Sequence, residues 1–549
     1  MAFALAVCTG CSSEKASEKS EPPPRPVAPS VYRGDTLPAI SEQGTRVEGG
    51  TLRIGMASEP PHLNPQLDPV DARGRDLAYY IYESLAQADP RNWRPEPRLA
   101  ESWEISEDRR TFRFRLRRGV KWHDGKPFSA DDVVFTFEKL RDPKVAATGM
   151  RGYVEPITSV VAEDPHTVVF TTSQPYWFAL EAITDIYIYP KHVFASGDFN
   201  AHPANRAPIG TGRYKFVEWK TGDHLTLAKN KSYYGTPGHL DTLTFVYVPD
   251  AQMRAQMIRN GELDVVERLA PEQWKALTQD AALADKFHRL RHVPDGIQWI
   301  GWNAAKPMFS DARVRRALTM LIDREDIVQN LRLGLDVPAA SWFYPGSPEH
   351  NPRITPWPYD PAGAAKLLAE AGWRDSNGDG TLDKGGVELA FTFLYPTNNP
   401  LYEQLAALIT TEMRAAKIAV STAKLEWSVY TERLRRQEFE ACSLVWKLEP
   451  KGDPYPIWHS SSIKEGSNWV GFKNAEADTM LEDARREFDR EKRAAIYQRF
   501  SELLHEQEPI TLLFNRYNLS MVSKRFGGVY STPYGLFRYD DFFAVGAAR

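Results

Sequence analysis

The sequence contains little cysteine, which limits how the fold can be held together. Only three cysteines occur in 549 residues, Cys8, Cys11 and Cys442, and two of them lie within the first eleven residues. The globular body therefore has one cysteine and no internal disulfide. Burial of apolar side chains, which make up 42% of the residues, has to stabilise the fold instead.

Long apolar runs and an excess of positive charge are also absent. A run such as Leu389 to Leu394 is far shorter than the roughly 20 residues that a membrane-spanning helix needs. After the first dozen residues we therefore expect no membrane span. The formal net charge of -4 provides no general attraction to phosphates, so nucleic acid is not expected as a partner.

Sequence motifs typical of nucleotide-binding and catalytic zinc sites are missing as well. The sequence has no GKS/T phosphate loop, and Gly210-Thr211-Gly212 lacks the third glycine of a dinucleotide site. The histidines form no HExxH pair, which argues against a catalytic zinc. Trp122-His123-Asp124-Gly125 is interpreted as a structural turn. We therefore expect no cofactor and no catalysis.

One segment has part of a calcium-loop pattern. Oxygen-bearing side chains fall at positions one, three, five and nine of an EF-hand-like loop, with the required glycine at position six, in Asp375, Asn377, Asp379, Asp383 and Gly380. Position twelve is Gly386 instead of a bidentate glutamate. The pattern therefore favours a polar hairpin loop over a calcium site.

The first residues resemble a lipoprotein leader. The apolar Ala2 to Val7 ends at Thr9-Gly10-Cys11, where small residues precede a cysteine as in a bacterial lipobox. Cys8 stands where an aliphatic residue is usual and a basic segment is missing, so we expect the true start upstream. With residues 1–11 as the remnant of the leader, the polar residues 12–46 are expected to form a flexible tether behind a lipid on Cys11.

The body alternates strand and helix patterns. Thr111 to Arg117 alternates strictly and predicts a half-buried strand. Asp311 can cap a helix with its apolar residues at helical spacing, and Asp360-Pro361 starts another that Gly372 can end. No fixed-period repeat occurs. The order of elements predicts a mixed α/β fold.

Several short motifs follow one another along the chain. They are Leu99 to Asp108, Lys121 to Gly125, Ala130 to Phe135, Gly210 to Tyr214, Asn230 to Tyr234, Gly261 to Val265, Asn303 with Arg315 to Ala317, Asn468 to Phe472, Arg493 and Pro509. In this order they resemble the motifs of the family-5 extracellular solute-binding proteins, which bind peptides, dipeptides or nickel, and the resemblance covers about residues 47 to 525.

The resemblance implies a bilobed periplasmic-binding-protein clamp with an inserted accessory domain and two crossing hinge strands. Its first lobe would comprise residues 47–80, 207–300 and 515–549, its accessory domain residues 81–206 and its second lobe residues 301–514. We expect the crossings near Trp299 to Asn303 and Ile510 to Asn515. Such a clamp closes around its ligand.

The resemblance also indicates where a ligand binds. In peptide-binding relatives an aspartate three positions after a tryptophan pairs with the peptide amine, and the local match is Trp446 with Glu449, while Asp453 competes for that role. Aromatic residues close by are candidate pocket walls, and the loop after the first strand is expected to bring the first lobe to the ligand. These further candidates are Tyr455, Trp458, Trp469, Glu59, His62 and Asn64.

Three functions are compatible with these features. The favoured one is the monomeric solute-binding subunit of an ABC importer, which delivers a peptide or other small solute to a membrane permease and its ATPase from the extracytoplasmic side. A binding module for a sensor or a periplasmic chaperone would use the same cleft. A hydrolase would need a nucleophile with a base, or paired carboxylates, and no spacing motif of that kind is present.

Overall fold

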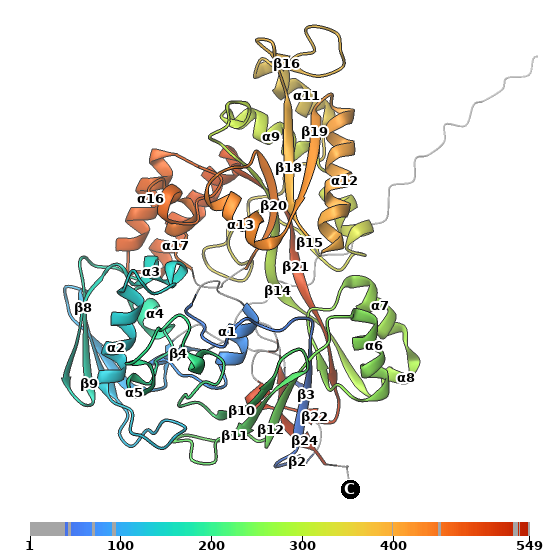
Figure 1. Ribbon diagram of the computed structural model, residues 1–549. Coiled ribbons are helices and arrows are strands. Elements are labelled where there is room, and N and C mark those ends of the chain that lie inside the picture. Colours follow the sequence, from blue (N-terminus) through green and yellow to red (C-terminus); the bar gives the residue numbers. More distant parts are fainter. Residues whose placement is uncertain are drawn as a thin grey trace, which may run out of the picture.

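The computed structural model describes residues 39–41, 45–67, 72–89, 95–397, 399–447, 452–530, 536 and 539–546 (Figure 1). Cys11, residues 12–38 and 42–44 of the predicted tether, and Glu449 lie outside the described residues. The end of the predicted tether differs from the expectation, because Ala39–Ser41 forms strand β1 and Arg46 begins strand β2 (Arg46–Val47).

One mixed sheet runs through the length of the molecule. Its order is β10-β11-β12-β3-β13-β21-β14-β20-β18-β19, and β15 pairs with β21 off this path. The strands are β10 (Tyr214–Lys220), β11 (His224–Lys229), β12 (Thr242–Tyr247), β3 (Thr51–Met56), β13 (Val265–Val266), β21 (Ile510–Ser523), β14 (Phe287–Trp302), β20 (Ala441–Lys447), β18 (Ala390–Pro396), β19 (Ala419–Leu425) and β15 (Val337–Pro338).

Two strands in the middle of this sheet join its two ends. β14 and β21 pair antiparallel from Phe287↔Ser523 to Gly301↔Ile510. At one end β13 lies beside β21, and at the other end β20 lies beside β14. The lower part of the molecule in Figure 1 (β3 and β10–β13) and the upper part (β18–β20) are therefore connected through this strand pair. The fold is a bilobed α/β clamp.

The segments expected to cross between the lobes lie in these strands. Trp299 to Trp302 ends β14, and Ile510 to Asn515 begins β21. The pairing itself is irregular between Arg291 and Gly296, where the register shifts twice, and again between Gln298 and Trp299. The two strands are therefore longer than expected, and their most irregular stretch lies closer to the lower part.

A second sheet forms a side unit, which comprises β4 to β9 and α2 to α5. It has the order β6-β7-β9-β8 and packs against α2, at the left of Figure 1. Its strands are β6 (Ala100–Ile105), β7 (Thr111–Leu116), β9 (Thr167–Thr172) and β8 (Ile157–Asp164), with β4 (Ala86–Ala88) and β5 (Pro95–Pro97) paired beside them. Phe112, Phe114 and Leu116 are buried, which confirms the predicted strand.

The remaining strands form short pairs. They are β1 (Ala39–Ser41) with β23 (Val529–Tyr530), β2 (Arg46–Val47) and β22 (Phe526–Gly527) with β24 (Phe543–Val545), and β16 (Asp383–Lys384) with β17 (Val387–Glu388).

Helices cover each part of the structure. The side unit contains α2 (Ala130–Arg141), α3 (Thr148–Val154), α4 (Ala179–Thr184) and α5 (Lys191–Phe194), and the lower part contains α1 (Ala72–Ala78), η1 (Pro203–Asn205), α6 (Ala251–Asn260), α7 (Pro271–Gln279), α8 (Ala281–Ala284) and η4 (Tyr539–Asp541). The upper part contains η2 (Pro307–Phe309), α9 (Ala312–Met320), α10 (Arg324–Asp326), η3 (Ile327–Leu331), α11 (Pro361–Glu370), α12 (Pro400–Ala415), α13 (Trp427–Arg435), α14 (Tyr455–Trp458), α15 (Ser462–Glu465), α16 (Ala475–Arg486) and α17 (Arg490–Gln507).

The predicted helix caps are confirmed. The Asp311 side chain accepts from the Arg313 amide at the start of α9, and Asp360 accepts from the Gly363 amide at the start of α11. Capping side chains satisfy backbone N–H groups that have no partner within the helix. The apolar faces of both helices pack into the core of the upper part, where Val314, Leu318 and Leu368 are buried.

Gly210 and Gly212 allow two backbone segments to touch. The Gly212 amide donates to the Ile81 carbonyl over 2.8 Å, and the Tyr214 amide donates to the Tyr80 carbonyl over 3.0 Å. A Cβ on Gly210 would lie 1.8 Å from the Ile81 carbonyl oxygen, a distance that no relaxation of side chains can relieve. The glycines thus bring the turn after α1 against the segment before β10.

Gly210→Ala should lower stability by about 3 kcal/mol, because the new methyl group forces the two backbones apart. The transition temperature by calorimetry measures this loss. Gly152→Ala is the matched control, since Gly152 lies in α3 with open space around its Cβ position, and it should be neutral or stabilising by about 0.5–1 kcal/mol. Equal transition temperatures for Gly210→Ala and the wild type would contradict the contact.

Candidate ligand-binding site

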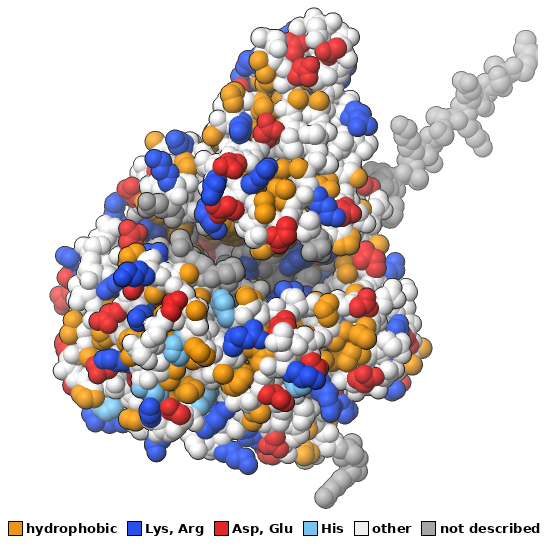
Figure 2. Space-filling view, in the orientation of Figure 1, with side chains coloured by type: hydrophobic (Ala, Val, Ile, Leu, Met, Phe, Trp, Pro, Cys, Tyr) orange, Lys and Arg blue, Asp and Glu red, His pale blue; other side chains and the backbone are white. Residues whose placement is uncertain are grey.

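A pocket lies between the lower part and the side unit, and one residue of the upper part also lines it. Figure 2 shows this face of the molecule hollowed between the upper and lower parts. The pocket wall is formed by the turn after α1, β4, the α4 region and the segment before β10, and Lys447 at the end of β20 adds a residue from the upper part. Elements distant in sequence therefore enclose a common space.

The pocket combines aromatic rings with charges of both signs. Its rings are those of Tyr79, Tyr80, Tyr82, Phe178, Tyr187 and Tyr233. Its acidic residues are Asp76, Glu83, Glu181, Asp185 and Asp540, and its basic residues are Arg75, Arg98, Arg213 and Lys447. Apolar walls with a few directed polar groups are typical of small-molecule sites.

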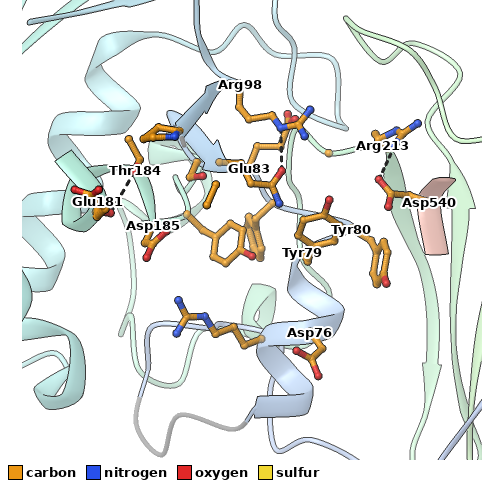
Figure 3. Close-up of a pocket in the computed structure, with 18 of the residues that line it drawn as sticks. Asp76, Tyr79, Tyr80, Glu83, Arg98, Glu181, Thr184, Asp185, Arg213 and Asp540 are labelled. Atoms are coloured by element: carbon orange, nitrogen blue, oxygen red, sulfur yellow. Dashed lines mark hydrogen bonds and ion pairs between the residues drawn. The ribbon is translucent and has the colours of Figure 1, made fainter. Parts of the chain in front are cut away.

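Hydrogen bonds hold several of these side chains in place. Both Tyr233 and Tyr234 donate their hydroxyls to Oε1 of Glu83, over 2.6 and 3.0 Å. On the other side, Arg213 forms an ion pair of 2.6 Å with Asp540, as Figure 3 shows. Burial raises the pKa of the Glu83 carboxyl above its usual value, and the hydroxyl of Tyr233 offsets part of this rise. Glu83 and Arg213 are therefore held in fixed positions by protein partners.

Three of the candidate tryptophans meet in one cluster of the upper part. Trp446, Trp458 and Trp469 line a small pocket together with Trp299 and Trp342. The ring of Trp446 lies 5.3 Å from that of Trp469 and 5.7 Å from that of Trp342, centroid to centroid. Trp446 lines this small pocket, and the next residue, Lys447, lines the larger pocket. The tryptophan cluster is therefore adjacent to the cleft.

The candidates in the loop after β3 bind neighbouring elements. Both Glu59 oxygens accept hydrogen bonds, from the Trp219 indole over 2.6 Å and from the Gly222 amide over 2.8 Å. Asn64 is buried and donates to Asn205 over 2.9 Å. His62 is half-buried in the same loop. None of the three lines the pocket between the parts.

Asp453 binds within the protein. Its carboxylate accepts from Nε of Arg485 over 2.7 Å and from the Tyr176 hydroxyl over 3.1 Å, and it is buried. The Arg485 guanidinium lies 3.6 Å from the centre of the Tyr455 ring, which also stacks on His459. Asp453 and Tyr455 thus belong to one cluster beside the tryptophans.

The calcium-loop candidates bind their own loop. Asp375 accepts from the Gly378 amide and pairs with Lys417 over 2.8 Å, while Asp383 accepts from Ser376. Asn377 donates to Asp379 over 2.7 Å. Within the described ranges, no three His, Cys, Asp or Glu side chains lie close enough to hold a metal ion.

The sequence prediction missed the residues of the turn after α1. Tyr79, Tyr80, Tyr82 and Glu83 lie within five consecutive positions, and all four line the pocket. In the sequence they are recognisable as three tyrosines within four positions, followed directly by Glu83. The pattern did not reveal that this turn faces the cleft, because Lys447 and Asp540, on its other walls, are hundreds of residues away.

The fold and the cleft define a class of protein, the two-lobed clamps that bind a solute between their lobes. A family model described as bacterial extracellular solute-binding proteins, family 5 (middle), matches residues 94–468. The chain belongs to this family and is the solute-binding subunit of an ABC importer.

Individual relatives agree over nearly the whole chain. The oligopeptide-binding protein AppA of Bacillus subtilis is 31% identical over 94% of this chain and 91% of its own length. The dipeptide-binding protein of Escherichia coli is 26% identical over 90% of this chain and 95% of its own.

Solved structures superpose as broadly. AppA of Bacillus subtilis in complex with a nonapeptide has a TM-score of 0.81 at 29% identity and covers 91% of this chain and 100% of its own. NikZ of Campylobacter jejuni in complex with Ni(L-His) has a TM-score of 0.77 at 26% identity, and the coverage is 90% and 99%. In the part of the chain that the structure describes, no helix is both long and apolar enough to cross a bilayer.

The buried carboxyl of Glu83 should make stability depend on pH. Because its folded pKa is raised, the unfolded chain ionises first, and the wild type should lose stability relative to Glu83→Gln as the pH rises above about 4.5. Urea unfolding of both proteins between pH 4 and 7 measures the difference. Glu107→Gln, at an exposed position, corrects for the loss of one charge. A difference that stays constant with pH would refute the assignment.

Proposed function

We propose that the cargo is a peptide, held without turnover in the pocket between the two parts. The observation that carries this proposal is the lining of the pocket, where tyrosine rings alternate with acidic and basic side chains. A peptide presents an ammonium, a carboxylate and apolar side chains, and charge-assisted hydrogen bonds in a desolvated cleft fix such groups. AppA, which was solved with a nonapeptide, supports the same class of cargo.

The tryptophan cluster is proposed to take part in this binding. Trp446, Trp458 and Trp469 adjoin the cleft through Lys447, so their rings can pack against an apolar or aromatic group of the solute. Tyr455 lies beside the same cluster. We retain Glu449 as the candidate partner of the peptide amine. We propose an indirect role for Glu59, His62, Asn64 and Asp453, which would support the elements that line the site.

We propose a division of the chain into two lobes and an accessory domain, based on which strands pair with one another. Residues 47–80, 207–300 and 515–549 form the first lobe, residues 81–206 the accessory domain and residues 301–514 the second lobe. The separate β6-β7-β9-β8 sheet supports the accessory domain. The change of neighbours along β21, from β13 to β15, supports a hinge between the lobes.

Peptides should raise the thermal stability of the purified protein, because a ligand that binds only the folded state adds about 2.7 kcal/mol at 100 times its Kd. We expect a shift in transition temperature with dipeptide to nonapeptide mixtures and none with neutral sugars or nickel-histidine. Mass spectrometry of solutes released on denaturation identifies the natural cargo. A single non-peptide solute would overturn the proposal.

Two variants locate the binding in the cleft. Trp446→Ala should weaken binding of an aromatic peptide about tenfold and of trialanine much less, because the lost ring contact is worth about 0.5–1.5 kcal/mol beyond area. Trp427→Ala is the matched control, since Trp427 is 51% exposed on α13 and is outside the cluster. Equal losses for the two variants in calorimetric titrations would contradict this placement.

We also propose that Cys11 carries a lipid that anchors the clamp to the extracytoplasmic side of a membrane. The small residues before Cys11 and the polar segment 12–46 support it. Cys11→Ser should move the protein from the membrane fraction to the soluble fraction when the full gene is expressed in a bacterium. Cys8→Ser is the control and should stay with the membrane. Membrane retention of Cys11→Ser would exclude this anchor.

A further inference from the structure

The side unit touches the upper part at a second junction, away from the β14–β21 pair. The segment between β9 and α4 contacts the end of α16 and the start of α17, at the left of Figure 1. The Trp177 amide donates to the Arg485 carbonyl over 3.1 Å, and the Tyr176 hydroxyl donates to Asp453 over 3.1 Å. Consecutive residues thus bond across the junction.

Buried charges surround these two bonds. Asp453 is 2% exposed and pairs with Arg485, and the Arg493 guanidinium lies 3.7 Å from the centre of the Trp177 ring. Tyr176 is also 2% exposed. Since the pair of Asp453 and Arg485 lies within the upper part, the charges stay compensated when the junction separates. Separation breaks the Tyr176 bond, the backbone bond and the contact of Arg493 with the Trp177 ring. It also breaks the cation–π contacts of Arg485 with Tyr176 and of Arg109 with Phe488.

The position of the junction links it to closure of the clamp. The strand pair β14–β21 joins the upper and lower parts through the middle of the sheet, whereas the junction lies at the far side of the cleft, between the side unit and α16–α17. A rotation about the strand pair that opens the cleft therefore separates Tyr176 from Asp453. A contact of few bonds across a closing gap suits a two-state element.

We propose that Tyr176, Trp177, Asp453 and Arg485 form a latch that holds the clamp closed. Asp453 is then a positioning residue, because its pair with Arg485 holds the start of the segment that carries Tyr455 and Trp458 and presents a carboxylate to Tyr176. The latch adds its free energy to the closed state whichever solute is bound, so its failure in the test below would leave the peptide proposal untouched.

Hydrogen exchange at the Trp177 amide reports the latch directly. In the ligand-free full-length protein, peptic peptides that contain Trp177 should exchange faster than those of β14 and β21, because the latch opens while the core stays folded. Tyr176→Phe removes one bond to a charged group and should speed exchange at Trp177 about tenfold, with the core strands unchanged.

Tyr430→Phe is the matched control. Tyr430 is a buried tyrosine whose hydroxyl donates to the Ser443 carbonyl over 2.7 Å within the upper part, so its loss should leave exchange at Trp177 as in the wild type. Exchange at Trp177 as slow as in β14 and β21 would show a permanent contact and overturn the latch. Unchanged exchange in Tyr176→Phe, or equal acceleration in Tyr430→Phe, would overturn it too.

Discussion

The pairing of β14 with β21 is the constraint on which the rest of the molecule depends. The two strands lie more than 200 residues apart in the chain, yet they pair from Phe287↔Ser523 to Gly301↔Ile510. Because β13 joins this pair near one end and β20 near the other, both halves of the sheet are built on it. Movement of the parts relative to one another has to be absorbed within these two strands.

The cleft follows from that arrangement. The turn after α1 provides tyrosines and Glu83, β20 provides Lys447, and Asp540 in η4 holds Arg213 in place. Glu83 accepts two tyrosine hydroxyls and Asp540 pairs with Arg213, which offsets part of the cost of burying these two carboxylates. A solute that supplies charges of both signs therefore meets a largely preformed surface, and the gain from closing comes from contacts that only the closed state makes.

The candidate residues of the sequence divided into two groups once the chain folded. Trp446, Trp458 and Trp469 did come together, because aromatic residues that cannot be exposed without cost collect where strand and loop ends converge. Glu59, Asn64 and Asp453 instead have protein partners for their polar atoms. A polar residue in a loop near a cleft can contact the ligand or can hydrogen-bond to other residues of the protein. The local sequence does not distinguish these two roles.

The sequence by itself determined the class of fold, the strand at Thr111, the caps at Asp311 and Asp360, and the family, because periodicity, capping and motif order are local properties. Tertiary structure alone decided which residues face the cleft and which bonds join the side unit to the upper part. The turn at Tyr79 and the pair of Tyr176 and Asp453 carry no local mark of their role. Their partners lie hundreds of residues away, and only the folded backbone sets those distances.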